Sequence, residues 1–325
     1  MNIALPKRIA IIYSDAKRKY FPTEEQYQSE AEVYPRAKLI AKHFNQLKVS
    51  TKLIPGNAQL VENLKKFNPT FALNLVDSVY GDESLSTAIP ATLELLGIPY
   101  TGAGIEGFSI ATNKYFTKIL LQKWGITTPK YQLIKEISEE IDPFLDYPLI
   151  VKLNTIHGGV EMNEHSVCQN EKELRTRISY LMKTYKQPIL VEEYIAGKEI
   201  SVIVTKGLNI KTYAVEKVFS KDIGLYEITT FQANWIDTDL YSYEKYQLPS
   251  QVKEDIKIAF DILKMDDYAK FDLRVDQAGR HYFIDCNANT SLGPKNHSPI
   301  GTILALYDIS FNDFLRRLIT NTLAD

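Results

Sequence analysis

The sequence predicts an α/β protein with an N-terminal parallel sheet and a strand-rich C-terminal part. Strand and helix patterns alternate through the first third of the 325 residues, an order typical of a parallel sheet with helices on both faces. The last third contains several strands and a hairpin of alternating polar and apolar residues. With 45% apolar and 24% charged residues, the composition is that of a globular protein, and the length allows two or three domains.

Hydrophobic periodicity predicts the individual elements. Short apolar runs are expected to be strands, and apolar side chains at helical spacing are expected to lie in helices. Before residue 104 the expected strands are 7–13, 51–54 and 70–76, and the expected helices are 30–47, 57–67 and 84–96. The composition changes at 101–104, where a junction between lobes is predicted. Beyond it the expected helices are 113–124, 171–185, 251–263 and 300–320, and the expected strands are 131–134, 149–153, 189–193 and several within 199–216.

Charge and hydropathy exclude several classes of function. The chain has 38 Lys and Arg residues against 40 Asp and Glu residues, without a basic block of the kind that binds nucleic acid. The N-terminal apolar run is too short for a signal peptide or a membrane span. Cys168 and Cys286 lack metal-ligand spacing, so reduced thiols are expected, with Cys286 in the core. We therefore expect a cytoplasmic protein without a nucleic-acid or membrane partner.

The predicted hairpin YAKFDLRVDQAGRHYFIDCN places polar side chains on one face. With Ala278-Gly279 as a two-residue turn, Asp272 lies opposite Asp285, and Lys270 lies opposite Asn287. The side chains expected to face a core are Phe271, Leu273, Val275, Tyr282, Ile284 and Cys286.

Two directly opposed carboxylates in such a hairpin repel each other. A divalent cation between them would remove that cost, and carboxylate and amide oxygens suit Mg²⁺. Asp272, Asp285 and Asn287 are therefore candidate metal ligands. The alternative is a surface hairpin with an ordinary polar face.

Three further segments are candidates for nucleotide binding. Lys152 ends a strand before LNTIHGGV, where backbone N–H groups and the ammonium could hold a phosphate. In ILVEEYIAGKEI, backbone groups near Tyr194-Ile195 could pair with an adenine edge, and Glu199 could accept ribose hydroxyls. Lys114 starts a helix with Thr112 or Asn113 as its cap. The alternatives, which no single motif removes, are a plain turn, an exposed strand end and a solvated lysine.

The order of these motifs is more specific than any one of them. A helix lysine, a strand-end lysine with a glycine loop, VEEYIAGKE and an Asp…Asp-x-Asn hairpin follow one another over nearly the whole chain. This order resembles the ATP-grasp superfamily, and within it the D-alanine–D-alanine ligase-like branch. The resemblance implies a three-lobed fold, with a Rossmann-like substrate domain at 1–104, a central lid at 105–192 and a C-terminal lobe with the metal site at 193–325. It also implies a homodimer.

The resemblance implies a role for each candidate residue. The ATP contacts would be Lys114, Lys152, Glu192, Tyr194, Ile195 and Glu199, the metal ligands Asp272, Asp285 and Asn287, and the catalytic residues Lys270, Gly158 and Gly159. ATP and Mg²⁺ are the implied cofactors, with two magnesium ions expected and Mn²⁺ able to substitute. Lys270 stands where the family commonly has an arginine, so the positive charge is kept but the bidentate fork is lost. Asp285 stands where the family usually has a glutamate.

Departures from the family concentrate on the substrate side. YSDAKRKYFPTEEQ replaces a glycine-rich stretch with a key glutamate, and none of Glu24, Glu25, Glu30 and Glu32 can be assigned to that role. Asp77-Ser78 replaces the family's His-Gly, and His157-Gly158-Gly159 replaces a serine pair. His157 and His297 are interpreted as polar loop residues. ANTSLGPKNHS replaces a shorter T-x-P-G segment, and Asn289 and Ser291 within it are candidate substrate residues. The family's Tyr-x-x-Lys-Tyr element is not recognisable within 217–243.

These observations predict an ATP-dependent carboxylate–amine ligase. One carboxylate would attack ATP to give an acyl phosphate and ADP, and an amine would then form the amide and release phosphate. The central lobe would close as a lid, because an acyl phosphate hydrolyses readily. The expected substrates are an amino acid and a second amino acid or small carboxylate. The alternatives are a D-alanine–D-alanine ligase, a carboxylate–thiol ligase, and an ATP-binding sensor or scaffold without turnover.

Overall fold

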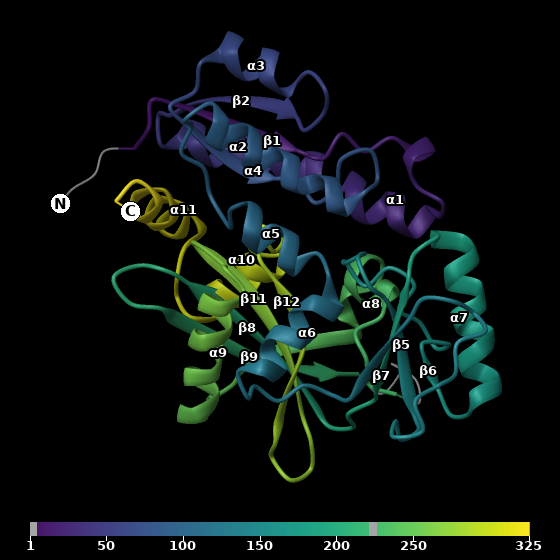
Figure 1. Ribbon diagram of the computed structural model, residues 1–325. Coiled ribbons are helices and arrows are strands. Elements are labelled where there is room, and N and C mark those ends of the chain that lie inside the picture. Colours follow the sequence, from purple (N-terminus) through teal and green to yellow (C-terminus); the bar gives the residue numbers. More distant parts are fainter. Residues whose placement is uncertain (1–4, 221–225, 325) are drawn as a thin grey trace.

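Three sheets form the framework of the protein (Figure 1). The computed structural model describes residues 5–220 and 226–324. The N-terminal sheet is parallel with the order β2-β1-β3, the central sheet has the order β4-β7-β5-β6, and the C-terminal sheet has the order β10-β9-β8-β11-β12. The strand pairs of the central and C-terminal sheets are antiparallel. The sequence prediction of a mixed α/β fold is confirmed.

The N-terminal sheet follows the predicted βαβ order. Its elements are β1 (Arg8–Tyr13), η1 (Arg18–Tyr20), α1 (Glu24–Ala31), α2 (Val33–Gln46), β2 (Ser50–Pro55), α3 (Leu60–Phe67), β3 (Phe71–Leu75), η2 (Glu83–Thr87) and α4 (Ala88–Leu95). The single helix expected at 30–47 is two helices that meet at Glu32. The first begins earlier than predicted because the Thr23 side chain caps it, accepting a hydrogen bond from the Gln26 backbone N–H.

The central sheet carries one long helix across its face. Its strands are β4 (Tyr131–Ile134), β5 (Leu149–Leu153), β6 (Val167–Cys168) and β7 (Ile189–Glu193), and the neighbouring helices are α5 (Ile105–Ala111), α6 (Lys114–Lys123) and α7 (Glu171–Tyr185). Helix α7 packs against β5, β6 and β7 (Figure 1). Asn113, one of the two predicted caps, begins α6 by accepting a hydrogen bond from the Phe116 N–H at 3.1 Å.

The C-terminal sheet contains the predicted hairpin at its edge. Its elements are β8 (Lys198–Thr205), β9 (Lys211–Phe219), α8 (Phe231–Trp235), η3 (Thr238–Leu240), β10 (Tyr241–Lys245), α9 (Ser250–Ile262), β11 (Tyr268–Val275), β12 (His281–Asn287), α10 (Pro299–Leu306) and α11 (Phe311–Thr322). The closing helix expected at 300–320 is two helices. Asp308 adopts a left-handed φ of 59° between them, and Ser310 caps the second helix.

The hairpin has the predicted pairing at the candidate metal site but not near its turn. Asp272 pairs with Asp285, and Lys270 pairs with Asn287. The turn has three residues instead of two, because the Asp276 N–H bonds to the Arg280 carbonyl and Gly279 adopts a φ of 80°. A register shift between Asp272 and Leu273 compensates for the extra residue.

The compensating shift changes which side chains of β12 reach the core. The prediction that Tyr282 and Ile284 face the core is wrong: Phe283 is buried there instead, and Ile284 lines the cavity described below. Phe271, Leu273, Val275 and Cys286 are buried as predicted. Both cysteines are buried free thiols. No helix in the described part of the chain is long and apolar enough to cross a membrane.

The predicted junction at 101–104 is held by the C-terminal part of the chain. The Gly102 N–H donates to the Asp267 carboxylate at 2.7 Å, and the Thr322 hydroxyl donates to the same carboxylate at 3.0 Å. The Ala103 N–H donates to Asn289 Oδ1 at 3.0 Å. Burial raises the pKa of Asp267 to about 7, so the fold favours the protonated carboxyl group.

Asp267 is expected to make stability fall as the pH rises. Because its folded pKa is above the unfolded value of about 4, its favourable contribution is complete below pH ~4 and is lost between there and about pH 7. Asp267→Asn cannot ionise, so the free energy of unfolding of this variant relative to the wild type should rise from pH 4 to 7. Urea unfolding at several pH values measures this, with exposed Asp261→Asn as the control. Parallel pH curves for the wild type and Asp267→Asn would contradict the assignment.

Candidate active site

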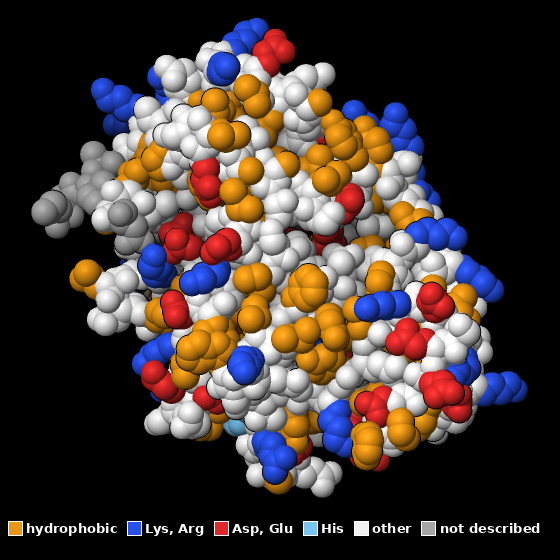
Figure 2. Space-filling model, in the orientation of Figure 1, with side chains coloured by type: hydrophobic (Ala, Val, Ile, Leu, Met, Phe, Trp, Pro, Cys, Tyr) orange, Lys and Arg blue, Asp and Glu red, His pale blue; other side chains and the backbone are white. Residues whose placement is uncertain are grey.

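One cavity of about 1020 Å³ lies between the three sheets and is lined by all of the candidate site residues. These are Lys114, Lys152, Gly158, Gly159, Glu192, Tyr194, Ile195, Glu199, Lys270, Asp272, Asp285, Asn287, Asn289 and Ser291. The surface in Figure 2 is hollowed where the N-terminal lobe meets the rest of the molecule, and acidic side chains gather around that hollow. Residues separated by more than 150 positions therefore share one site.

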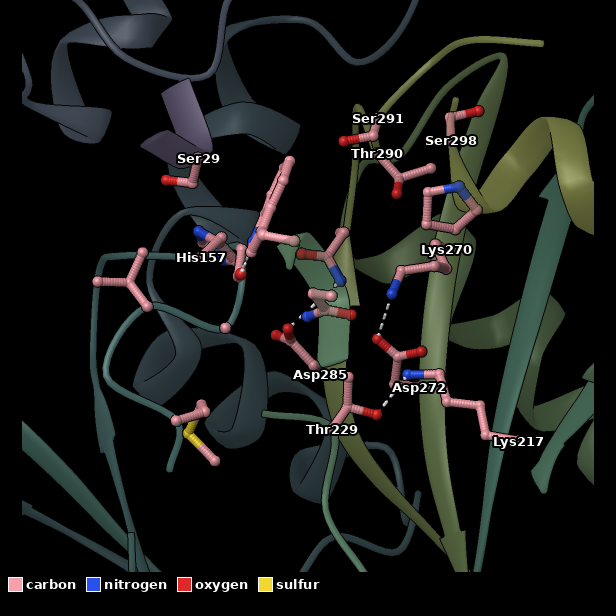
Figure 3. A pocket seen from close by; sticks show the side chains of 18 of the residues that line it. Ser29, His157, Lys217, Thr229, Lys270, Asp272, Asp285, Thr290, Ser291 and Ser298 are labelled. Carbon is pink, nitrogen blue, oxygen red and sulfur yellow. Dashed lines mark hydrogen bonds and ion pairs between the residues drawn. The ribbon is translucent and has the colours of Figure 1, made fainter. Parts of the chain in front are cut away.

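The hairpin strands β11 and β12 present the candidate metal ligands to this cavity. Lys270 Nζ lies 2.6 Å from Asp272 Oδ2 (Figure 3). The Ser201 hydroxyl donates to Asp272 Oδ1 at 2.6 Å. Asn287 Nδ2 donates to Asp285 Oδ2 at 3.3 Å. The two acids are thus held by different partners, although they are directly opposed in the sheet.

Asp285 lies among positive charges. Burial alone would raise its pKa, but Lys114, His157 and Lys152 outweigh burial and hold the pKa well below the usual range. The carboxylate is therefore ionised at any pH near neutrality. No cluster of three or more His, Cys, Asp or Glu residues that could hold a metal occurs within residues 5–220 and 226–324. Two carboxylates and one amide nevertheless fit Mg²⁺, which takes one or two protein carboxylates and completes its coordination with phosphate oxygens and water.

A buried charge cluster joins the helix α6 to the strands of the central sheet. Glu192 is fully buried and forms ion pairs with Lys118 at 2.7 Å and Lys152 at 2.7 Å. Burial opposes ionisation of Glu192, but the two lysines lower its pKa overall. The sequence predictions did not include Lys118. Its position four residues after Lys114 in TNKYFTK puts both lysines on one helix face, and that spacing could have identified it.

The glycine loop predicted to hold phosphate is fixed by contacts with two other elements, α8 and η2. Gly158 and Gly159 have φ values of 74° and 72°, and a Cβ at Gly159 would lie 2.8 Å from Asn234 Nδ2. Trp235 Nε1 donates to the Gly158 carbonyl at 2.7 Å. His157 lies at a cavity wall, where its backbone N–H and Nδ1 both contact the Glu83 carboxylate, at 2.9 and 2.6 Å. This loop accordingly needs glycine at both positions and is tied to η2.

A second buried charge cluster lies at the proposed nucleoside end of the cavity. Glu199 Oε1 contacts Lys217 Nζ at 2.7 Å and Thr229 Oγ1 at 2.6 Å, and its Oε2 contacts Arg274 Nη1 at 3.3 Å. Lys217 and Arg274 outweigh the effect of burial and lower the pKa of Glu199 to about 2. The sequence predictions did not include Lys217, Thr229 or Arg274. Of the stretch 217–243, where no family element was recognisable, residues 221–225 lie outside the described part of the chain.

The structure distinguishes among the four N-terminal glutamates that sequence could not separate. Glu24 forms an exposed ion pair with Arg18 at 2.7 Å, and Glu25 accepts a hydrogen bond from the Glu161 N–H at 2.9 Å. Glu32 is exposed. Glu30 lines the cavity, is only 5% exposed, and its Oε2 atom has no hydrogen-bond partner. Burial, followed by the nearby Asp77 and Glu83 charges, raises the pKa of Glu30.

Asp77 and Arg36 form the rest of this N-terminal wall. Arg36 Nη2 lies 3.7 Å from Asp77 Oδ2, and the buried Arg36 Nε has no hydrogen-bond partner in the described structure. Asn289 and Ser291, the two candidate substrate residues, also line the cavity, but Asn289 Oδ1 is already bonded to the Ala103 N–H. The wall therefore combines an acid that has one unsatisfied oxygen with a loosely paired guanidinium.

Comparison of the chain with known proteins identifies its family. A family model described as the D-Ala–D-Ala ligase C-terminus matches residues 119–320. The chain belongs to the D-Ala–D-Ala ligase family. It is therefore an ATP-dependent, ADP-forming ligase that makes C–N bonds, and the predicted ATP-grasp resemblance is confirmed.

Relatives of this ligase share its length and its fold. A D-alanine–D-alanine ligase of Nitrosospira multiformis is 26% identical over 258 residues, which are 74% of this chain and 75% of that protein. D-alanine–D-alanine ligase A of Bacillus cereus is 27% identical over 277 residues, which are 81% of this chain and 83% of that protein. A crystal structure of the Bacillus anthracis D-alanine–D-alanine ligase complexed with ATP has a TM-score of 0.73 at 20% identity and covers 98% of both chains.

Proposed function

We propose that this ligase activates a substrate carboxylate as an acyl phosphate and joins it to the amine of an amino acid. The observation that supports this most directly is the distribution of charge in one cavity. Cationic side chains and opposed carboxylates lie on the central and C-terminal walls, and the buried Glu30, whose Oε2 atom has no hydrogen-bond partner, lies on the N-terminal wall. The first set suits ATP, whereas a buried acid with an unsatisfied oxygen suits a substrate ammonium group.

The proposed roles of the residues follow from their contacts. Lys114 and Lys152 bind the phosphates, and Lys270 offsets the charge of the phosphoryl group as it moves. The loop at Gly158 and Gly159 covers the phosphates with backbone N–H groups and excludes water. Glu192, Tyr194, Ile195 and Glu199 surround the nucleoside. We also propose that the three lobes of the protein meet at residues 104 and 192. The same proposal includes a homodimeric state and a cytoplasmic location.

Magnesium would be held by Asp272, Asp285 and Asn287. We expect two ions, for which Mn²⁺ could substitute, and the bound metal would neutralise charge on the terminal phosphates. The carboxylate substrate attacks the terminal phosphorus, and ADP leaves with the electron pair of the broken P–O bond. The amine of the second substrate then attacks the acyl carbon, loses a proton, and displaces phosphate. Lys152 and Lys270 stay in place through both steps because ion pairs with Glu192 and Asp272 fix their ammonium groups.

D-alanine–D-alanine ligation is the second candidate function, because the relatives described above carry that name. The cavity walls argue for a different substrate pair, since Asp77 adds a carboxylate where the resemblance leads us to expect His-Gly, and His157 stands where it leads us to expect serine. ADP release with Mg-ATP against pairs of D- and L-amino acids and small carboxylates tests both candidates, with mass spectrometry of each product. D-alanyl-D-alanine as the best product would support the second candidate, and ATP binding without ADP release from any pair would support a sensor or scaffold.

Glu30→Gln is expected to weaken binding of the amine-bearing substrate. Removing the carboxylate charge should raise the half-saturating concentration of that substrate at least about tenfold, equivalent to roughly 1.4 kcal/mol. Saturation kinetics of ADP release measure this value, and the half-saturating ATP concentration should stay within about twofold of that of the wild type. Glu24→Gln, at an exposed residue of the same helix that pairs with Arg18, is the matched control. Equal effects of the two substitutions would contradict the role of Glu30.

A further inference from the structure

Arg274 connects three of the segments at the nucleoside end of the cavity. It lies on β11, directly across from Glu199 of β8 in the sheet register. Arg274 Nε donates to the Ile195 carbonyl at 3.0 Å, and its Nη1 donates to the Glu227 carbonyl at 2.7 Å and contacts Glu199 at 3.3 Å. One side chain therefore holds three parts of the chain, which are Ile195 just after β7, Glu199 in β8, and Glu227.

Arg274 also fixes the aromatic ring next to this segment. Its Nη2 donates to the Tyr194 hydroxyl at 3.2 Å, and its guanidinium lies 5.3 Å from the centre of the Tyr194 ring. The Tyr194 ring also contacts Tyr226, whose ring centre lies 5.0 Å from that of Tyr194. Tyr194 consequently has little freedom to turn away from the cavity wall.

The position of Arg274 argues for a role in binding rather than in packing alone. The residue is only 4% exposed, yet it lines the cavity together with Tyr194, Ile195 and Glu199. It lies two residues from Asp272 on the same face of the same strand, so it points into the same site. Five N–H donors in a planar fork allow it to reach several acceptors at once, which a lysine cannot do.

From these contacts we propose that Arg274 is a positioning residue for the adenosine part of ATP. It binds the Ile195 carbonyl, orients the Tyr194 ring, and shares the Glu199 carboxylate with Lys217 and Thr229. Glu199 Oε1 already accepts two hydrogen bonds, whereas Oε2 accepts one, so Oε2 is the atom left for a sugar hydroxyl. This inference rests on the proposed binding of ATP in this cavity.

The proposal predicts that Arg274 matters for the nucleoside and not for the phosphates. Arg274→Met should weaken binding of the Mg²⁺ complex of AMP-PNP, a slowly hydrolysed ATP analogue, at least about tenfold. Binding of inorganic tripolyphosphate, which has no nucleoside, should stay within about twofold. Arg274→Lys keeps the charge but not the fork, and it should behave nearly as Arg274→Met does. In steady-state turnover the half-saturating ATP concentration should rise, with a smaller change in the rate at saturation.

Isothermal titration calorimetry of the full chain measures both ligands, with Arg280→Met, in the exposed hairpin turn, as the matched control. Unchanged AMP-PNP binding by both Arg274 variants would overturn the proposal. Equal losses for AMP-PNP and tripolyphosphate in a variant that melts like the wild type would also overturn it, because the nucleoside would not be the part affected. If Arg274→Met does not fold, Arg274→Lys decides the question. Failure of the wild type to bind AMP-PNP would instead contradict the proposed function.

Discussion

Asp285→Asn is expected to lower the rate of ADP release at least about a hundredfold, equivalent to roughly 2.7 kcal/mol of transition-state stabilisation. Lys114, His157 and Lys152 keep the Asp285 carboxylate ionised in a buried site. A neutral amide there would leave these cations without their central negative charge and would remove one proposed metal ligand. Binding of Mg-ATP should become weaker but remain measurable.

The controls for Asp285→Asn separate charge from shape. Asp285→Glu restores the carboxylate with one more methylene, which the family usually has, so this variant should be clearly more active than Asp285→Asn. Turnover is measured as ADP release at saturating Mg-ATP with the substrate pair that gives the highest rate in the wild type. Near-normal turnover by Asp285→Asn would contradict the proposed metal site.

Glu192→Gln is expected to lower the free energy of unfolding by about 3–5 kcal/mol. Removing one partner of a buried ion pair leaves an uncompensated charge in a medium that solvates it poorly. Here two lysines lose their partner, and the Lys118 side chain is only 3% exposed. The urea concentration at the midpoint of unfolding should fall accordingly. The buried cluster therefore connects stability to the site, since Lys152 of the same cluster lines the cavity.

Glu193→Gln is the matched control, at the next position of the same strand. Glu193 is 16% exposed and pairs with Lys130, whose side chain is 56% exposed; a pair with one such exposed partner contributes about 1 kcal/mol or less. A similar loss of stability in the two variants would mean that burial of Glu192 does not determine its effect. A loss in neither would mean that Lys118 and Lys152 find other partners or release their protons.

The candidate site shows where local pattern was sufficient and where it was not. Alternation along β11 and β12 predicts that Asp272 and Asp285 are opposed, because neighbouring strands place every second residue on one face. The predicted turn of the same hairpin is one residue too short. The bulge that compensates for this error lies in β12 at Ile284, which has no pairing partner in β11. Alternation alone could not reveal the longer turn or the bulge. Because of these two irregularities, Phe283 occupies the core in place of Ile284.

The sequence by itself determined the α/β class, most helices and strands, the family, and part of the set of residues that line the cavity. Each of these depends on short-range periodicity or on the order of motifs along the chain. Only the tertiary structure separated Glu30 from Glu24, Glu25 and Glu32, since their difference lies in distant partners and burial. It likewise revealed the contacts of Arg274 with Glu199 and of His157 with Glu83. Such contacts join segments more than 70 positions apart, and they form only when the folded chain brings these segments together and excludes water from the charges between them.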